Sequence, residues 1–297
     1  MNKKMENKKY GIITPMDYSS SLGTRVTYWM MFGFLMLMVV VCLAPVLFAF
    51  FSGFKTTEEF YSLNVKLFPD NIDFSKMFEI IKELKLGRAF VVSMILFAIT
   101  WFGDVVIGGI AGYTISRLKP KGSAMLFKLM LWTMMMPGTL SMVPLFMFWA
   151  DVPVIHISFL NTFVPFIIGS FGNIFHILMF KNFFDGIPNS FIEAAKIDGA
   201  SNLGIFFKVI VPLSKPIIMT ITIFAFTGSW NNFMSPFLYL KDPQLAPVAL
   251  KLYNTTVGYP EPTILLAAFL ITIPVLIVYF VCSNQILAND MSAGVKE

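Results

Sequence analysis

The sequence is poor in charged residues and in cysteine, and each shortage excludes a class of protein. Only 13% of the 297 residues are charged and 57% are hydrophobic, whereas about a quarter of a soluble chain is usually charged. The two cysteines, Cys42 and Cys282, both lie inside apolar runs. They predict packed apolar thiols rather than a disulfide scaffold. The composition therefore predicts an integral membrane protein.

Motifs for nucleotide, metal and nucleic-acid binding are also missing. No Gly-x-x-x-x-Gly-Lys-Ser/Thr loop occurs, since Lys121-Gly122-Ser123 has the wrong order and no glycine frame. Neither His156 nor His176 has a Cys, Asp or Glu at ligand spacing, so no metal site is predicted. No basic helix interleaved with aromatics indicates a nucleic-acid partner, and no cluster of catalytic groups indicates an enzyme. If ATP drives this protein, the ATPase site is expected on another chain.

Six apolar stretches are each long enough for a helix to cross a bilayer, which takes about 20 residues. They predict an all-α membrane protein with six transmembrane helices. The expected spans are Thr27–Phe51, Ala89–Ile115, Ala124–Trp149, Leu160–Phe180, Pro216–Leu238 and Thr263–Gln285. The first apolar run lies too far from the start and is too long for a cleavable signal peptide, so we interpret it as a retained span.

The distribution of Lys and Arg around these spans predicts the orientation of the chain. More of them flank one side of the predicted bundle than the other, and the richer side is expected in the cytoplasm. This places both terminal tails, 1–25 and 287–297, in the cytoplasm and the transmembrane domain at 26–286. Within that domain the connection 53–87 is expected outside and the connection 182–215 inside.

The long outer connection carries apolar residues at helical spacing and predicts a short amphipathic helix against the outer face. The residues concerned are Phe74, Met77, Phe78, Ile81 and Leu84. Two interpretations stay open: a structural helix that rests on the bilayer, or part of a docking surface for a soluble partner. The second outer loop, Tyr239–Pro262, is rich in proline and is a further candidate contact surface.

The polar stretch Asn182–Lys215, between the fourth and fifth spans, predicts two short helices in an elbow. Ser190 and Glu193 have capping-box spacing, and Gly199 can adopt the left-handed conformation that ends a helix. A second helix is expected over Ser201–Val211. The pair is either an ordinary interfacial element or a docking element for a soluble partner.

Several strings resemble the motifs of ABC importer permeases. EAAKIDGAS followed by IVPLSKP is similar to the EAA motif of that family. AGYTISRLKPKG (111–122), WNNFMSPF (230–237) and the terminal MSAGVKE resemble further family stretches, the last with one glycine replaced. The resemblance covers most of the chain and is strongest to the second permease subunit of carbohydrate importers, of the maltose and glycerol-phosphate transporter kind.

This resemblance implies a type I ABC importer transmembrane domain, multi-pass in a bacterial-type cell membrane. It implies a homologous second permease, two cytoplasmic ATPase subunits that bind ATP and Mg²⁺, and an extracytoplasmic solute-binding protein. This chain would bind no cofactor itself, and would form half of the pathway for a sugar such as an oligosaccharide. The first elbow helix would be the coupling helix, docked on the ATPase. Its implied contact residues are Ser190, Glu193, Ala194, Ala195, Asp198 and Gly199.

Five polar or aromatic residues within the predicted spans are candidates for the translocation cavity: Asp104, His176, Trp230, Asn231 and Asn232. A carboxylate inside a membrane is costly and is by default a functional candidate. The alternative for Asp104 and His176 is a polar contact between helices. Trp230 and the two asparagines either contact sugar or pin the fifth span against the partner permease.

A secondary transporter or channel that needs no ATPase is the alternative function. It would predict several buried charges along a pathway and paired broken helices in repeated halves. The sequence instead has one acid deep inside a span and one large polar connection, which favours the importer.

The orientation can be tested with single cysteines and a thiol reagent that does not cross membranes. In intact cells we expect a cysteine at Lys66 or Gln244 to react, and one at Lys121 or Ser201 to react only after the membrane is opened. The unmodified chain, which retains its two native cysteines, is the control. Labelling at Ser201 from outside would overturn the orientation.

Overall fold

The described residues form a bundle of helices, as the sequence predicts. The structure is a computed structural model that describes residues 22–64 and 66–294. Among these residues the one extended pairing is an isolated β-bridge between Val152 and Ile157. Most of the expected tail 1–25 lies outside the described residues, and residues 287–294 of the other expected tail continue the last helix.

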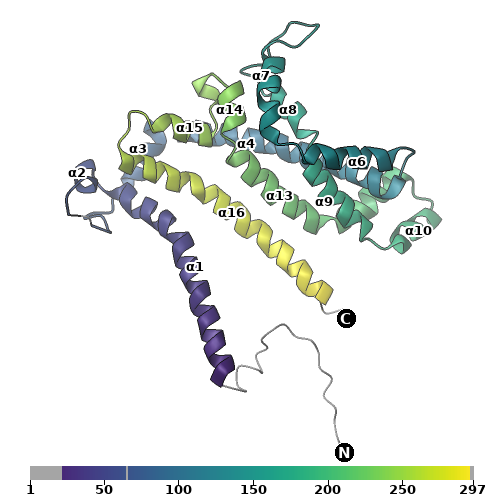
Figure 1. Cartoon of the computed structure of the whole chain (residues 1–297), viewed down its shortest axis with the longest axis horizontal. Coiled ribbons are helices and arrows are strands. Elements are labelled where there is room, and N and C mark those ends of the chain that lie inside the picture. The colour runs from purple at the N-terminus through teal and green to yellow at the C-terminus, as the bar shows by residue number, and fades with distance from the viewer. Residues whose placement is uncertain (1–21, 65, 295–297) are drawn as a thin grey trace, which may run out of the picture.

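Four helical stretches of the described chain are long and apolar enough to cross a bilayer unaided (Figure 1). They are α1 (Leu22–Phe54), the run from α4 to η3 (Leu86–Leu118), α8 with α9 (Val164–Asp185), and α16 (Glu261–Gly294) as far as Ser283. The second run consists of α4 (Leu86–Phe102), the π-helical turn η2 (Gly103–Ile107), α5 (Gly108–Tyr113) and the π-helical turn η3 (Thr114–Leu118). Two bent pairs bring the number of candidate spans to six.

The predicted third span is not one straight helix. It consists of α6 (Ser123–Met134), then η4 (Gly138–Ser141) with α7 (Met142–Ala150), and the two parts are bent by 91°. Pro137, in an extended conformation, lies at the break. Proline has no N–H for the helical hydrogen bond and disfavours helix in the residue before it, so the helix stops there.

The predicted fifth span ends earlier than expected. Helix α13 (Lys215–Trp230) stops at Trp230, and a separate short helix, α14 (Met234–Tyr239), follows after a break. Asn231 and Asn232, expected deep inside the span, therefore lie in this break. At its other end α13 is bent by 75° from the helical stretch Asn202–Leu213.

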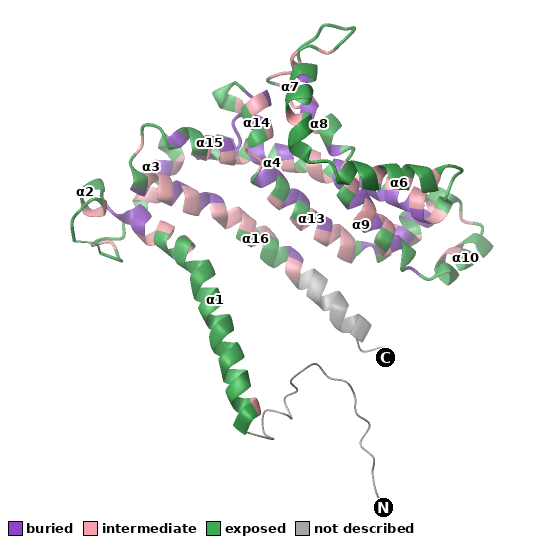
Figure 2. Ribbon diagram, in the orientation of Figure 1, coloured by how far each residue is buried: buried purple, intermediate pink, exposed green. Residues whose placement is uncertain are grey.

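Within the described residues, helix α1 is buried against the bundle at its last turn. Ser52, Gly53 and Phe54 are buried, and a Cβ added to Gly53 would lie 2.7 Å from the Cβ of Leu266 in α16. Almost all of the helix before Val46 is exposed (Figure 2). The sequence predicted this span from its length, and in the structure most of its apolar surface is not covered by the described residues.

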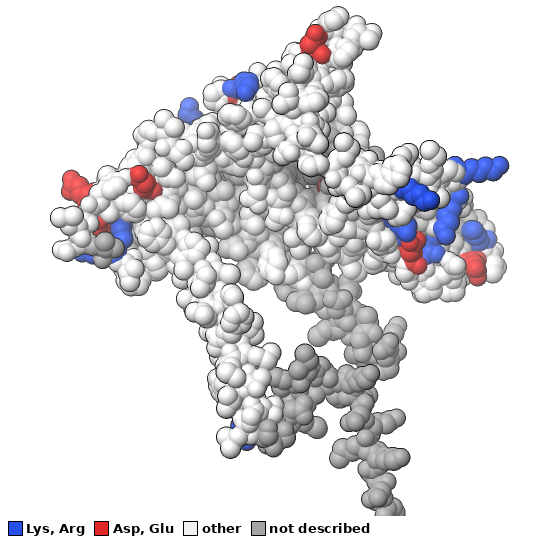
Figure 3. All heavy atoms as spheres, viewed as in Figure 1, with Lys and Arg blue, Asp and Glu red and all other residues white. Residues whose placement is uncertain are grey.

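Apart from the buried Asp104, the charged residues of the described chain lie toward its ends and connections. In Figure 3 a wide uncharged body separates a few charged groups near α2 (Thr57–Phe60) from a basic group around α10 (Asn189–Ile197). The Lys and Arg residues in and around the two connections at this end, between the second and third spans and between the fourth and fifth, are Arg117, Lys119, Lys121, Lys128, Lys181, Lys196, Lys208 and Lys215. An uncharged middle is what a bilayer requires, because charge there is costly.

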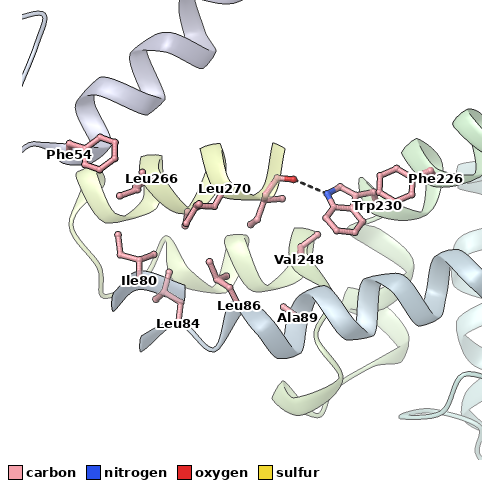
Figure 4. Close-up of a cluster of buried hydrophobic side chains, with 12 residues drawn as sticks. Phe54, Ile80, Leu84, Leu86, Ala89, Phe226, Trp230, Val248, Leu266 and Leu270 are labelled. Carbon is pink, nitrogen blue, oxygen red and sulfur yellow. Dashed lines mark hydrogen bonds between the residues drawn. The ribbon is translucent and has the colours of Figure 1, made fainter. Parts of the chain in front are cut away.

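Trp230 belongs to the larger of two apolar cores. Its indole Nε1 donates to the backbone carbonyl of Ile271, 3.1 Å away, and its ring stacks on Phe226 (Figure 4). Only 2% of its surface is exposed. It therefore joins α13 to α16 within this chain. The sequence analysis expected it in the cavity or against a partner permease, and the structure places it in the core instead.

A second core lies at the end of the molecule near α10. It joins α5 and η3 to α9 (Ile174–Asp185), η5 (Phe206–Ile210) and α13, with Tyr113, Phe180, Phe184, Ile187, Ile205, Phe206, Ile210 and Ile221 buried. Gly112 makes the close approach possible, because a Cβ there would lie 2.7 Å from the Cβ of Phe180. The second span and α9 are thus in direct contact at this level.

The predicted amphipathic helix of the connection 53–87 is confirmed, with Ile80 rather than Phe78 on its buried face. Helix α3 (Ser75–Glu83) directs Ile80 into the first core, and Leu84 just after it is also buried. Phe78, expected on that face, is 75% exposed. The stripe that packs is Met77, Ile80, Ile81 and Leu84, which follows the 3.6-residue period more closely. Between α14 and α16 lie the short helices η6 (Pro243–Leu245) and α15 (Val248–Thr255).

The packing role of Trp230 is testable by stability. Trp230→Ala removes a large buried ring and leaves a cavity, which costs about 3–5 kcal/mol. We expect the thermal midpoint of the detergent-solubilised protein to fall by roughly 5 °C or more. Trp132→Ala is the matched control, because Trp132 is 67% exposed on α6. Equal midpoints for the two variants would contradict this role.

Candidate functional site: an exposed elbow and a polar cavity

The elbow (residues 189–213) consists of α10, α11 (Asn202–Ile205), η5 and α12 (Val211–Leu213). The predicted capping box at its start is wrong. Helix α10 begins at Asn189 after Pro188, and no side chain caps it. Ser190 is already inside the helix and, like Glu193, is exposed. Asn189 is engaged elsewhere, since its side-chain carbonyl accepts a hydrogen bond from Arg117.

The end of α10 is built as the sequence predicts. Gly199 has φ of +77°, the left-handed conformation that glycine adopts without cost. Its N–H donates to the Lys196 carbonyl at 3.0 Å, and the Ala200 N–H donates to the Ala195 carbonyl at 2.9 Å. This pair of bonds is the Schellman motif. The second helix starts directly afterwards, with the Ser201 hydroxyl accepting from the Gly204 N–H at 3.2 Å.

Helix α10 has one face on the second core and one in the open. Ile192 and Ala195 pack against the core, so Ala195, expected to face a partner, faces this chain. Exposed on α10 and its turn are Asn189, Ser190, Phe191, Glu193, Ala194, Lys196, Ile197, Asp198 and Gly199. The exposed Phe191 and Ile197 were not among the predicted contacts, although their helical spacing with Ala194 could have revealed a second apolar stripe.

Arg117 fastens the elbow to the second span. It lies in η3, at the end of that span, and its guanidinium donates to the carbonyls of Phe184 and Ile187 and to the Asn189 side chain. The neighbouring Ser116 donates to Asp185 at 2.6 Å. A rigid fork of donors suits several acceptors at once. The end of the second span, the end of α9 and the start of α10 are therefore held as one unit.

The polar cavity has a volume of about 370 Å³ and lies between the second span, α7, α8 (Val164–Ser170), α14 and the breaks that follow α8 and α13. Its lining is Thr100, Asp104, Leu145, Trp149, Pro165, Phe166, Ile168, Gly169, Ser170, Asn173, Asn232, Ser235 and Tyr239. Of the predicted cavity residues, Asp104 and Asn232 line it and His176 adjoins it. Asn231 is exposed beside it and Trp230 is in the core.

Asp104 makes a polar contact across the helices, one of the two interpretations of the sequence, but its partner was not predicted. Its Oδ2 lies 2.9 Å from Nδ1 of His176 on α9, and both side chains are buried. Asn173, which caps α9, lies 2.8 Å from the same imidazole nitrogen through its Nδ2. The other carboxylate oxygen, Oδ1, is buried and has no hydrogen-bond partner. Asp104 therefore both contacts a neighbouring helix through His176 and lines the cavity, so each of its two interpretations is met in part.

Helix irregularities bring these polar groups to one place. Asp104 lies on the π-helical turn η2, and such turns occur often at functional sites. Gly103 lets α8 approach, because a Cβ there would lie 2.3 Å from Oγ of Ser170. Asn173 comes from the break between α8 and α9, and Asn232 from the break between α13 and α14. Within the part of the chain that is described, no three His, Cys, Asp or Glu residues form a group able to hold a metal.

We expect Arg117→Ala to release the elbow. Hydrogen bonds to a charged group are worth about 1.5–3 kcal/mol each, and each 1.4 kcal/mol is a factor of ten in an equilibrium. Amide hydrogen exchange over 189–197 should therefore accelerate at least about tenfold. Lys121→Ala, an exposed neighbour, is the control and should leave the exchange unchanged. Unchanged exchange in Arg117→Ala would mean that the elbow is held by packing alone.

Comparison with known proteins agrees with this architecture. Residues 104–291 match the family of binding-protein-dependent transport system inner membrane components, and the chain belongs to that family. It is the permease subunit of an ABC importer, a multi-pass membrane protein and not an enzyme. Such a subunit works with a partner permease, an ATPase and a solute-binding protein. A secondary transporter or channel is not favoured.

Two relatives illustrate the similarity. The polygalacturonan/rhamnogalacturonan transport system permease protein YtcP of Bacillus subtilis is 31% identical, over 93% of this chain and 100% of its own length. The trehalose transport system permease protein SugB of Mycobacterium tuberculosis is 30% identical, over 92% and 98%. A solved bacterial ABC transporter for the acidic polysaccharide alginate has the same fold, with a TM-score of 0.77 over 89% of this chain and 24% identity.

Proposed function

We propose that this chain forms half of the transmembrane pathway of an ABC importer for a carbohydrate, with an oligosaccharide as the substrate class. The relatives' names support the substrate class, since they include polygalacturonan, trehalose, diacetylchitobiose and galactooligosaccharides. The pathway would lie between this chain and a homologous second permease. The composition of the cavity, with amides, hydroxyls and aromatic rings, suits a hydroxyl-rich solute.

The elbow is proposed as the coupling site for one of two ATPase subunits, on which ATP and Mg²⁺ would bind. The observation that supports this proposal is that the two faces of the elbow differ. Its outer face is open, with small Ala194 beside exposed Phe191 and Ile197, and its inner face is fastened to the second span through Arg117. A partner that moves α10 would therefore move the second span and α9 with it.

The proposed contact set is revised from the predicted one. Ser190, Glu193, Ala194, Asp198 and Gly199 keep their place on the outer face, and Phe191 and Ile197 join them. Ala195 is withdrawn from the contact and assigned to the chain's own packing. Glu193 would meet a basic group of the partner, because no capping bond occupies its carboxylate.

The orientation follows from the same proposal. The elbow end, with its basic residues, would face the cytoplasm together with both termini, in agreement with the preference of Lys and Arg for that side. Helices α3 and α15 would lie outside, where a solute-binding protein docks. Closure of the ATPases would draw the elbows together, and the cavity would open alternately to each side.

The experiment is a docking test on the purified complex. Ala194→Trp adds bulk to the open face and should remove the ATPase subunits while the permease pair stays assembled. Gly199→Val should also lose the ATPase. Open space surrounds its Cβ position, so the defect would come from the positive φ, which β-branched residues strongly disfavour. Retained ATPase is measured on affinity-purified complex, with stimulated hydrolysis alongside.

Lys208→Trp is the matched control, because Lys208 is exposed in η5 and lies outside α10. It should retain the ATPase. If Ala194→Trp and Gly199→Val both kept full ATPase and full stimulated hydrolysis, α10 would not be the coupling helix.

A further inference from the structure

The cavity beside Asp104 contains a polar group whose hydrogen-bonding capacity is not used. Asp104 Oδ1 is buried without a partner, and only 1% of the residue is exposed. A buried acceptor that is left unsatisfied is costly, and more so when it is charged. A ligand hydroxyl or amide that donates to this oxygen would therefore relieve that cost. The cavity wall thus holds a strong acceptor that this chain leaves unsatisfied.

The surroundings of Asp104 are those of a small-molecule site. The volume of about 370 Å³ is within the range of such sites, about 300–1,000 Å³. Around the carboxylate stand amide and hydroxyl groups on three separate elements, with Asn173, Asn232 and Ser235 among them. Trp149 and Tyr239 add aromatic surface. Hydroxyl donors, amide groups and ring faces together match the chemistry of a sugar residue.

The backbone at this site supports the same assignment. Two helix breaks converge on the cavity, after α8 and after α13, and a π-helical turn carries Asp104 between them. Irregular backbone at membrane depth is tolerated only where protein covers it or where it lines a water-filled cavity. Breaks that meet at one cavity are also where transported solutes bind in other classes of transporter.

The charges of the site discriminate between kinds of sugar. The lining contains Asp104 and neither Lys nor Arg. The imidazole of His176 is close to the carboxylate but is buried and is not part of the lining. A uronate would therefore bring a second carboxylate to a wall that has no cation to receive it. An uncharged sugar residue would instead donate its hydroxyls to Asp104.

We propose that Asp104 is the specificity-determining acceptor of a sugar subsite in this chain, which takes an uncharged sugar residue and disfavours a uronate. The proposal rests on the proposed carbohydrate pathway and adds to it the charge class of the substrate. Asn232, on the wall formed by the break after α13, contributes to binding without regard to charge. Gly103 and η2 hold the carboxylate in place.

The test is direct binding to the purified permease–ATPase complex without the solute-binding protein, so that the partner's own selectivity does not enter. The neutral probes are radiolabelled α-(1,4)-galactotriose, maltotriose and raffinose. The acidic probe is trigalacturonate, which differs from the first only in oxidation at C6. We expect wild-type complex to bind at least one neutral probe saturably and galacturonate more weakly.

Three variants separate recognition from folding. Asp104→Asn removes the charge but keeps the shape. It should lower affinity for the neutral probe about tenfold and also reduce the preference for neutral over acidic sugar. Asn232→Ala should lower affinity for both probes and leave that preference unchanged. Asp151→Asn, an exposed acid in the loop after α7, should match wild type. Retention of the ATPase subunits checks assembly in every case.

Three results would overturn the subsite. They are a wild-type complex that binds none of the neutral probes, an assembled Asp104→Asn complex with unchanged preference, and a wild-type preference for trigalacturonate. The ATPase test of the elbow measures subunit retention and does not depend on sugar binding. Failure of the subsite is therefore distinguishable from failure of the importer function.

Discussion

The need to satisfy every backbone hydrogen bond inside the membrane constrains this fold more than any other interaction. In hydrocarbon an unpaired N–H or C=O costs several kcal/mol, so a spanning segment is helical unless something else satisfies its backbone. The chain departs from regular helix at Pro137, after Ser170 and after Trp230, and the last two departures border one cavity. Regular helix accounts for the bundle, and the interruptions account for where polar groups gather inside it.

The elbow, the second span and the cavity are connected by direct contacts. The fork of Arg117 and the Ser116–Asp185 bond fix the elbow to the second span, and the same span carries Asp104 on η2 further along. One continuous helical stretch, Leu86–Leu118, therefore carries both Arg117, which holds the elbow, and Asp104, which lines the cavity. In the proposed importer, a movement of α10 would reach the cavity wall through this helical stretch.

The sequence predicts what depends on local chemistry. Span existence follows from apolar length, and the turn at Gly199 follows from its permissive backbone. The start of α10 could not be read in the same way, because Asn189 is recruited by Arg117 from 72 residues away in the chain. The Asp104–His176 pair was hidden for the same reason, as each residue alone resembles an isolated polar group within a span. The predicted positions of Ala195 and Phe78 were wrong, because which face of a helix is buried depends on the elements packed against it as well as on the spacing of its apolar residues.

The candidate site was predictable in composition and less so in arrangement. Asp104, His176 and Asn232 were identified as unusual for a membrane interior, and they do lie in or beside one cavity. Trp230 was not separable from them by sequence, because a buried indole that donates to a carbonyl and one that stacks on a sugar have the same local signature. Only the position of Ile271 decides between the two.

The shape of α1 has a consequence for motion. Its 33 residues extend about 50 Å, and its buried residues all lie beyond Pro45, which removes one intrahelical hydrogen bond. Close packing within the described bundle is therefore concentrated at one end of a long helix. A turn of about 10° at that end would move the other end through roughly 6 Å, given about 35 Å of helix before Pro45 at 1.5 Å per residue. Small adjustments at Gly53 and Leu266 would become large displacements at the opposite membrane surface.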